Sequence, residues 1–191
     1  MRTALIFFKP VERDFDGEYY SQVAWAFKCG GVDVNTVEIL SCTDERAFRH
    51  RIDEFKDTCD NVIVINNQSL TFDLKEIIAE KFETVLDENE NAKVFLDAVS
   101  KSDGVDYPNS FALLPIEATV VPNIKGAFQG FMLDASEFTL VCLPESFEQI
   151  KPMCDNYVLP YLENKFGITQ KRLVLKYFGD QRALEKTLSQ A

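Results

Sequence analysis

The sequence has no apolar run of the roughly 18 residues that a membrane-spanning helix needs. The apolar run at residues 3–8 follows a single arginine and ends at Lys9-Pro10, so it is too short for a secretory signal and lacks a cleavage site of small residues. We therefore expect this run to be a buried strand. We also expect a cytoplasmic protein that does not bind a membrane.

Basic residues are few: 20 Lys and Arg stand against 31 Asp and Glu, and the formal net charge is −11. Affinity for nucleic acid comes mainly from basic side chains that neutralise phosphates, so this balance argues against a nucleic-acid-binding protein. The charge is uneven, because residues 171–191 contain five basic and two acidic side chains, which gives this segment +3 and residues 1–170 a net −14. With 46% hydrophobic residues, the composition is that of a globular chain with about one domain.

Histidine and paired cysteines are also scarce. His50 is the only histidine and lies among arginines, which predicts a solvated helix face rather than a metal or catalytic site. The five cysteines are odd in number and form no C-x-x-C pair, so a disulfide framework or a zinc site is not expected. We expect buried, reduced thiols. The sequence contains no P-loop, G-x-G-x-x-G or G-x-S-x-G motif.

The first half of the sequence alternates strand and helix patterns. Continuous apolar runs are typical of strands buried on both faces, and apolar residues three or four apart predict helices. This alternation predicts an α/β fold with a largely parallel sheet. The expected strands are residues 3–8, 32–40 and 61–65, and the expected helices are residues 18–29, a helix capped by Thr43 with Phe48, Ile52 and Phe55 on one face, and residues 72–86.

The second half has shorter elements separated by Pro and Gly. A proline inside a helix costs about 3 kcal/mol and usually kinks it, so Pro152 and Pro160 should divide the helical pattern of residues 145–166 into two pieces. The other expected elements are a helix at 88–100, short strands at 110–114, 119–121, 130–133, 138–143 and 172–178, and a last helix capped by Asp180.

The loop after the third expected strand is the best site candidate by position. In an open parallel sheet, ligands bind beyond the carboxyl ends of the strands. This loop offers Asn66, Asn67, Ser69 and Thr71, with Asp73 at the start of the next helix. Its composition is unfavourable for an anion, because a phosphate-binding loop needs glycines and this loop has none. The competing interpretation is purely structural: Thr71 caps the helix and Asp73 complements the helix dipole.

Aromatic residues on the first expected helix offer a second candidate surface. Tyr19, Tyr20, Trp25 and Phe27 could stack on the ring of a ligand. Their helical spacing beside apolar residues instead favours packing in the core.

Residues 114–131 resemble a signature of the CinA (competence/damage-inducible protein A) family. The family pattern is L-P-x-x-A-T-x-x-P-N-x-x-G-x-x-x-G-F, and this chain reads LPIEATVVPNIKGAFQGF without a gap. Further matches are Leu143-Pro144, Lys151-Pro152-Met153 and the segment 158–162. The resemblance extends over nearly the whole chain, since the order of elements in the first half also agrees.

This resemblance implies a fold and an activity. The fold would be the molybdopterin-binding fold of the MoaB/MogA proteins, a three-layer α/β/α sandwich. The activity associated with the family domain is metal-dependent hydrolysis of ADP-ribose-type pyrophosphates. Some members carry a separate C-terminal amidase domain that acts on nicotinamide mononucleotide, and we expect no such domain in these 191 residues.

The chain departs from the family at the motifs that would perform this chemistry. Where the family has T-G-G-x-G-P-T-x-D-D, residues 65–74 read INNQSLTFDL, so that only Thr71 and the first aspartate, Asp73, remain. The glycines are gone, and one carboxylate cannot share a divalent cation as two can. An early G-x-E-L-L-x-G segment has become residues 7–13, FFKPVER, with Tyr19 in place of the asparagine that closes that region. The family's L-P-G-x-P-x-E appears as LPESFEQ at residues 143–149.

Two functions follow from this pattern. The leading hypothesis is a CinA-like domain with a degenerate catalytic site, which acts as a binding or scaffold module for a nucleotide-like small molecule or another partner. The rival is a divergent nucleotide pyrophosphatase that uses Asp73 and Thr71, with Glu145 or Glu148 as new ligands, and only this rival implies a divalent metal. Binding of a pterin cofactor is less favoured, because this anionic group also needs the missing glycines.

The sequence also predicts the domain organisation. Residues 1–167 would form the CinA-like domain, and residues 168–191 would begin a second small module of one strand and one helix. Such a module is too small for a core of its own, so we expect it to dock on the main domain or on a second copy of the chain. This reasoning predicts a homo-oligomer.

Overall fold

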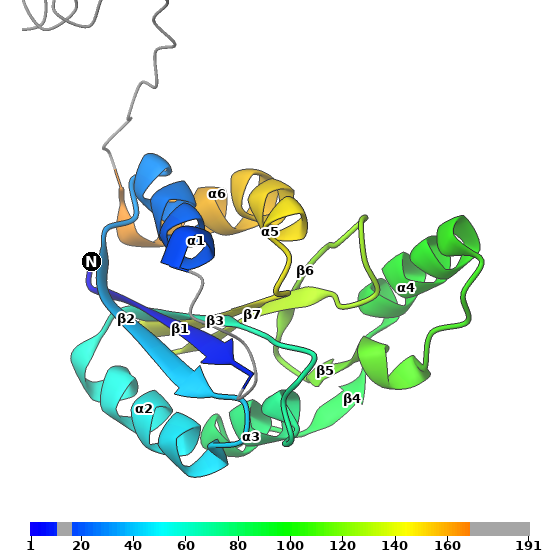
Figure 1. The fold of residues 1–191 in the computed structure, drawn as a ribbon, viewed down its shortest axis with the longest axis horizontal. Helices are drawn as coiled ribbons and strands as arrows, with labels where there is room; N and C mark the ends of the chain where they lie inside the picture. The colour runs from blue at the N-terminus through cyan, green and yellow to red at the C-terminus, as the bar shows by residue number, and fades with distance from the viewer. Residues whose placement is uncertain (11–16, 169–191) are drawn as a thin grey trace, which may run out of the picture.

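A computed structural model describes residues 1–10 and 17–168. The expected strand at 172–178 and the helix after Asp180 lie outside these residues. The described chain forms a six-stranded sheet in the order β2-β1-β3-β8-β7-β6 and a separate two-stranded sheet of β4 and β5 (Figure 1). The strands are β1 (Thr3–Lys9), β2 (Val34–Ser41), β3 (Asn61–Ile65), β4 (Leu86–Glu88), β5 (Leu113–Pro115), β6 (Thr119–Val121), β7 (Gly130–Ala135) and β8 (Phe138–Leu143).

Most of the large sheet is parallel, as the sequence predicted. Strand β1 pairs in parallel with β2 and β3, and β3 pairs in parallel with β8. Strand β7 is antiparallel to both of its neighbours, β8 and β6. All five residues of β3 and all six of β8 are buried, because these central strands are covered on both faces.

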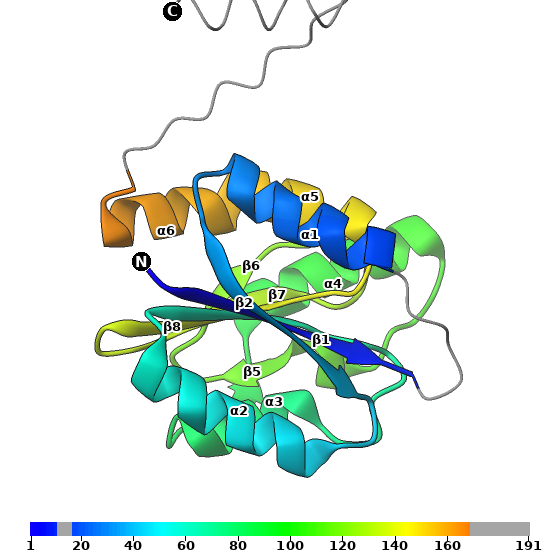
Figure 2. The ribbon, with the colours of Figure 1, turned by 60° about the vertical axis from the view of Figure 1, so that its left-hand side comes forward.

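Helices cover both faces of the large sheet and give three layers (Figure 2). One core contains Ile6, Val64 and Leu140 and is covered by α2 and α3, and the other contains Leu5, Ile63 and Val141 and is covered by α1, α5 and α6. Side chains alternate between these cores along each strand because the strand period is two residues. The helices are α1 (Gly17–Cys29), α2 (Glu45–Thr58), α3 (Leu74–Lys81), α4 (Glu90–Asp103), α5 (Phe147–Met153) and α6 (Leu159–Phe166), with a 3-10 turn η1 (Asn109–Ala112) and a π turn η2 (Cys154–Val158).

The structure corrects three sequence predictions of helix and strand extent. Asp44, not Thr43, caps α2, since its Oδ1 accepts a hydrogen bond from the N–H of Ala47 at 2.9 Å. The helix expected at 72–86 is only Leu74–Lys81. The rest of the expected range contains Glu83, whose φ is 55°, and Leu86, the first residue of β4. The strand expected at 110–114 is mostly the η1 turn followed by β5.

The helical pattern of the proline-containing region is interrupted, as expected, but not at Pro152. The π turn η2 lies between α5 and α6, Pro152 lies inside α5, and Pro160 occupies the first turn of α6. Gly30 lies close to this region: a Cβ on it would come within 2.4 Å of Leu159 Cδ1, so a larger residue would have to displace the Leu159 side chain.

Two expectations about burial are only partly right. Phe27 is buried, and Tyr19 and Tyr20 pack edge-on against Phe7, but Trp25 is 61% exposed on the outer face of α1. Helical spacing therefore placed one aromatic side chain in the wrong environment. The five cysteines are free thiols; Cys42, Cys142 and Cys154 are buried, whereas Cys29 and Cys59 are half-buried. Within residues 1–10 and 17–168, no helix is long and apolar enough to cross a membrane.

Candidate functional site

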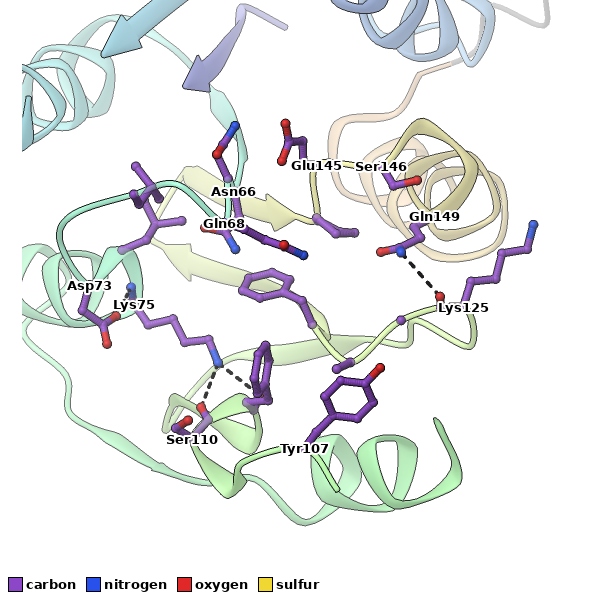
Figure 3. Close-up of a pocket in the computed structure, with 18 of the residues that line it drawn as sticks. Asn66, Gln68, Asp73, Lys75, Tyr107, Ser110, Lys125, Glu145, Ser146 and Gln149 are labelled. Atoms are coloured by element: carbon purple, nitrogen blue, oxygen red, sulfur yellow. Dashed lines mark hydrogen bonds between the residues drawn. The ribbon is translucent and has the colours of Figure 1, made fainter. Parts of the chain in front are cut away.

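A cleft of about 1130 Å³ lies beyond the carboxyl ends of β3 and β8. The two strand ends are joined there, since the Asn66 N–H donates to the Leu143 carbonyl at 2.7 Å. This is the edge of the sheet where the sequence placed a site. Four segments form the walls: the β3–α3 loop, the segment from the end of α4 to η1, the β6–β7 loop, and the β8–α5 connection (Figure 3).

Asn67 fixes the shape of the β3–α3 loop (residues 66–73). Its side chain is 5% exposed; Nδ2 donates to the Phe8 carbonyl at 3.2 Å, and Oδ1 accepts from the Ser69 N–H at 2.8 Å. The Leu70 N–H donates to the Asn67 carbonyl at 3.2 Å. An asparagine that bonds two residues ahead forms an Asx turn, which mimics a backbone turn. Both the nitrogen and the oxygen of the Asn67 side-chain amide therefore make hydrogen bonds within the protein.

Asp73 is the N-cap of α3. Its Oδ1 accepts hydrogen bonds from the N–H groups of Lys75 at 2.8 Å and Glu76 at 3.2 Å. The predicted Thr71 cap is wrong: the Thr71 N–H and hydroxyl both point to the Cys42 carbonyl, at 3.1 and 3.4 Å. The β-region backbone of Asp73 suits an N-cap, whereas Thr71 lies two residues too early in the chain.

The five predicted site residues are therefore divided. Asn66, Asn67 and Asp73 line the cleft, and so does Glu145 from the β8–α5 connection. Ser69 and Thr71 lie in the same loop but do not line it, and Glu148 borders a neighbouring hollow with Lys151 and Asp155. Asp73 and Glu145 therefore line the same cleft, whereas Glu148, the other proposed new ligand, does not.

Lys75 is a lining residue that the sequence interpretation missed. Its side chain is 8% exposed, and its ammonium donates to the carbonyls of Ser110 at 3.3 Å, Phe111 at 3.0 Å and Leu113 at 2.8 Å. Burial lowers the pKa of this ammonium, although Cys142 and Asp73 act in the opposite direction. Lys75 precedes Ile78 by three residues and so shares the apolar face of α3, a signal that was present in the sequence. It joins α3 to the η1 wall.

The β6–β7 loop (residues 122–129) is built around a buried amide network. Asn123 Nδ2 donates to the Phe128 carbonyl and to Gln149 Oε1, both at 2.9 Å, and Asn123 Oδ1 accepts from the Lys125 N–H at 3.0 Å. Gln129, which is fully buried, accepts from the Asn123 N–H at 2.7 Å and donates to the Asn123 carbonyl at 3.2 Å. This network explains why the P-N-x-x-G-x-x-x-G-F pattern of the resemblance is structural.

Aromatic rings from several segments line the cleft. They include half-buried Tyr107 and Phe111, whose ring centroids are 6.1 Å apart in an edge-to-face pair, and Phe128, whose ring lies 5.4 Å from the Lys75 ammonium. Tyr19 also reaches the cleft, and its hydroxyl donates to the Glu145 carbonyl. The remaining rings in the lining are Phe72 and Phe147.

The residues of the cleft do not fit a divalent metal. Such an ion needs several oxygen ligands, and the described part of the chain has no group of three or more His, Cys, Asp and Glu side chains that could hold one. One oxygen of Asp73 already accepts two backbone hydrogen bonds, and Leu74 follows where a second carboxylate would have to stand. His50 does not contribute: it lies exposed on α2, 3.8 Å from Glu54, on the solvated face that was expected.

The β3–α3 loop offers a phosphate few N–H groups. An anion at a helix N-terminus needs free backbone N–H groups. In this loop and the first turn of α3, the N–H groups of Asn66, Ser69, Leu70, Thr71, Lys75 and Glu76 already donate within the protein.

No protein-family profile matches the chain. Three putative competence-damage inducible proteins are similar to it. That of Clostridium beijerinckii is 27% identical over 154 residues, which are 78% of this chain and 37% of the relative. Those of Caldanaerobacter subterraneus subsp. tengcongensis and Acetivibrio thermocellus are each 33% identical, over 108 and 127 residues (55% and 63% of this chain, 26% and 30% of the relative). The chain thus spans less than two fifths of the length of these relatives.

Solved structures show the same fold. The CinA protein of unknown function from Thermoplasma acidophilum superposes with a TM-score of 0.62 at 16% identity, covering 85% of this chain and 96% of that one. A molybdenum cofactor biosynthesis protein B gives 0.54 at 13% identity, with 87% and 94% covered. The molybdopterin biosynthesis Mog protein from Mycobacterium ulcerans gives 0.51 at 13% identity, with 86% and 99% covered. The resemblance predicted from the sequence is confirmed, and the chain carries a CinA-like domain with the MoaB/MogA fold.

Proposed function

We propose that this domain is a small-molecule-binding module without a hydrolytic site. The observation that carries the proposal is the use of Asp73: the carboxylate best placed for metal-dependent chemistry instead caps α3 through two backbone hydrogen bonds. A cleft of this size, lined by aromatic rings and a few polar groups, is the usual form of a ligand site.

The rival function is a divergent nucleotide pyrophosphatase. Its support is that Asp73 and Glu145 line one cleft at the strand ends. Against it, hydrolysis of a pyrophosphate needs positive charge or metal ions around the phosphates, and the lining has three carboxylates (Asp73, Asp103, Glu145) against two lysines.

Incubation of the full chain with ADP-ribose and Mg²⁺ or Co²⁺ tests the proposal. We expect no hydrolysis above the protein-free rate. Turnover that Asp73→Ala or Glu145→Gln abolishes, and that the exposed control Glu163→Gln retains, would overturn it.

We also propose that the protein is cytoplasmic and forms a homo-oligomer through residues 168–191, the start of a second small module. The support is charge: this segment is basic, whereas residues 1–170 carry a net −14. Light scattering of the full chain against a chain shortened to end at Gly167 tests this. An unchanged number of subunits on shortening would exclude tail-mediated association.

A further inference from the structure

The charges of the cleft disfavour an anionic ligand. The lining contains Asp73, Asp103 and Glu145, and the Tyr107 hydroxyl donates to Asp103 at 3.1 Å. Only two lysines, Lys75 and Lys125, line the cleft with these three carboxylates, and the Lys75 ammonium already donates to three carbonyls. Among the described lining residues, Lys125 alone is a cation with its ammonium exposed to solvent. A phosphate in this cleft would meet more negative than positive charge.

Two carboxamides remain available to a ligand. Asn66 and Gln68 line the cleft, and neither side chain makes a hydrogen bond with another described residue. Figure 3 shows both on one side of the cleft, with Tyr107 and Ser110 on the other side. Gln149, by contrast, is occupied by Asn123 and the Lys125 carbonyl. A carboxamide offers an acceptor and a donor side by side, which match an N–H next to a C=O.

Rings supply the apolar surface opposite these amides. Tyr107, Phe111 and Phe128 line the cleft from two separate segments, and each is only half-buried. Contacts between aromatic side chains and a flat ring stabilise binding whatever the ring's substituents. Flat, uncharged ligands therefore gain from these rings without meeting the carboxylates as an anion would.

We propose that the cleft binds an uncharged, flat heteroaromatic ring that carries a lactam edge, an N–H beside a C=O, and that it discriminates against the phosphorylated form of the same compound. Asn66 and Gln68 hydrogen-bond the lactam, and the ring lies against Tyr107, Phe111 and Phe128. This inference rests on the proposed binding function and specifies the ligand class.

Inosine and inosine monophosphate form a matched pair of probes, because they share one lactam ring and differ by a phosphate. Isothermal titration of the full chain should show inosine binding at least about tenfold more tightly, with the difference shrinking as salt is added. Equal or tighter binding of the monophosphate, or no binding of inosine, would overturn the inference.

Variants assign the binding to these residues. Asn66→Ala and Gln68→Ala should each weaken inosine binding about three- to tenfold, the usual effect of a lost hydrogen bond, whereas the exposed α6 control Asn164→Ala should not change it. Tyr107→Leu should weaken binding about tenfold, and Tyr157→Leu, an exposed tyrosine that does not line the cleft, serves as its control. Binding that is unchanged in all three cleft variants would overturn the inference.

These results are separable from those of the proposed function. Hydrolysis of ADP-ribose that depends on Asp73 would contradict the binding-only function whatever inosine does. Failure of inosine to bind, with no hydrolysis, would overturn the ligand class and leave the absence of a hydrolytic site standing.

Discussion

The β3–α3 loop and the β6–β7 loop border the same cleft, but their polar side chains are arranged differently. The β6–β7 loop is organised around two buried amides, Asn123 and Gln129, which are 1% and 0% exposed. In the β3–α3 loop, Asn67 is the buried amide, and Gln68, Ser69, Thr71 and Asp73 are exposed.

The difference separates residues that hold the cleft from residues that a ligand can reach. A buried amide with all its hydrogen bonds made is rigid. Replacing it leaves its hydrogen-bond partners buried and unsatisfied, because water does not reach them. Exposed polar groups can change with little effect on folding. This contrast explains how the chain retains the fold-shaping 122–131 segment while its β3–α3 loop differs from the pattern of the CinA resemblance.

Replacing the two buried asparagines is the strongest test of this comparison. Asn123→Ala removes hydrogen bonds to the Phe128 carbonyl, Gln149 and the Lys125 N–H, and should lower the free energy of unfolding by about 2–4 kcal/mol. Asn67→Ala removes two hydrogen bonds and should cost about 1–2 kcal/mol. Denaturant unfolding measures both, and an equal or larger loss for Asn67→Ala would break the comparison.

Lys75 links the β3–α3 side of the cleft to the η1 wall. Lys75→Met should lower stability at pH 7 by about 1–3 kcal/mol, since three carbonyls lose their donor. Because burial lowers the pKa of this lysine in the folded protein, the unfolded chain binds more protons between that lowered pKa and the ordinary 10.5. The stability of the wild type should therefore rise relative to Lys75→Met as pH increases through this range. Denaturant unfolding of both proteins from pH 7 to 11 tests this prediction. A stability difference that falls as pH increases would contradict it.

Gly126 tests how closely the β6–β7 loop fits against α5. A Cβ at this position would lie 2.7 Å from Gln149 Nε2, so Gly126→Ala must displace the side chain that bonds Asn123. We expect a loss of about 1–2 kcal/mol. The same substitution in a Gln149→Ala background should cost less, because the clash is gone. Thermal or denaturant unfolding of the four chains measures this coupling, and additive losses would show that the contact is not tight.

Asp73 gives the smallest expected effect on stability. Asp73→Ala removes the N-cap of α3 and should cost about 1 kcal/mol, whereas Asp73→Ser, which keeps a capping oxygen, should recover most of it. Neither variant should change inosine binding more than about twofold, because Asp73 acts on the helix and not on the uncharged ring. Full stability of Asp73→Ala would show that the carboxylate is not used as a cap.

Local patterns in the sequence were sufficient for most strands of the large sheet, and they pointed to its carboxyl edge as the place of a candidate site. The run at residues 61–65 coincides with β3, and residues 119–121 and 138–143 coincide with β6 and β8. Alternating strands and helices imply a parallel sheet, and a parallel sheet implies a site at its carboxyl edge. The helix caps were predicted wrongly because two residues with capping side chains lie close together in each case. Thr43 and Thr71 are each followed within two residues by the aspartate that caps the helix.

The ligand-facing residues depended on contacts between distant segments. Asn66 and Asn67 are adjacent in sequence and both line the cleft, yet only the Asn67 side chain bonds the Phe8 carbonyl, 59 residues earlier. Tyr107, Phe111 and Lys75 line the cleft from two segments, which the Lys75 ammonium joins by donating to carbonyls 35 to 38 residues away.

The amino-acid sequence by itself determined the layered α/β fold, the CinA-like pattern and the loss of glycines from the β3–α3 loop, because these depend on local spacing and residue type. The tertiary structure alone decided which polar groups remain free in the cleft. Hydrogen bonds such as those of Lys75 and Asn123 join segments that no local pattern relates, and they determine which side chains a ligand can reach.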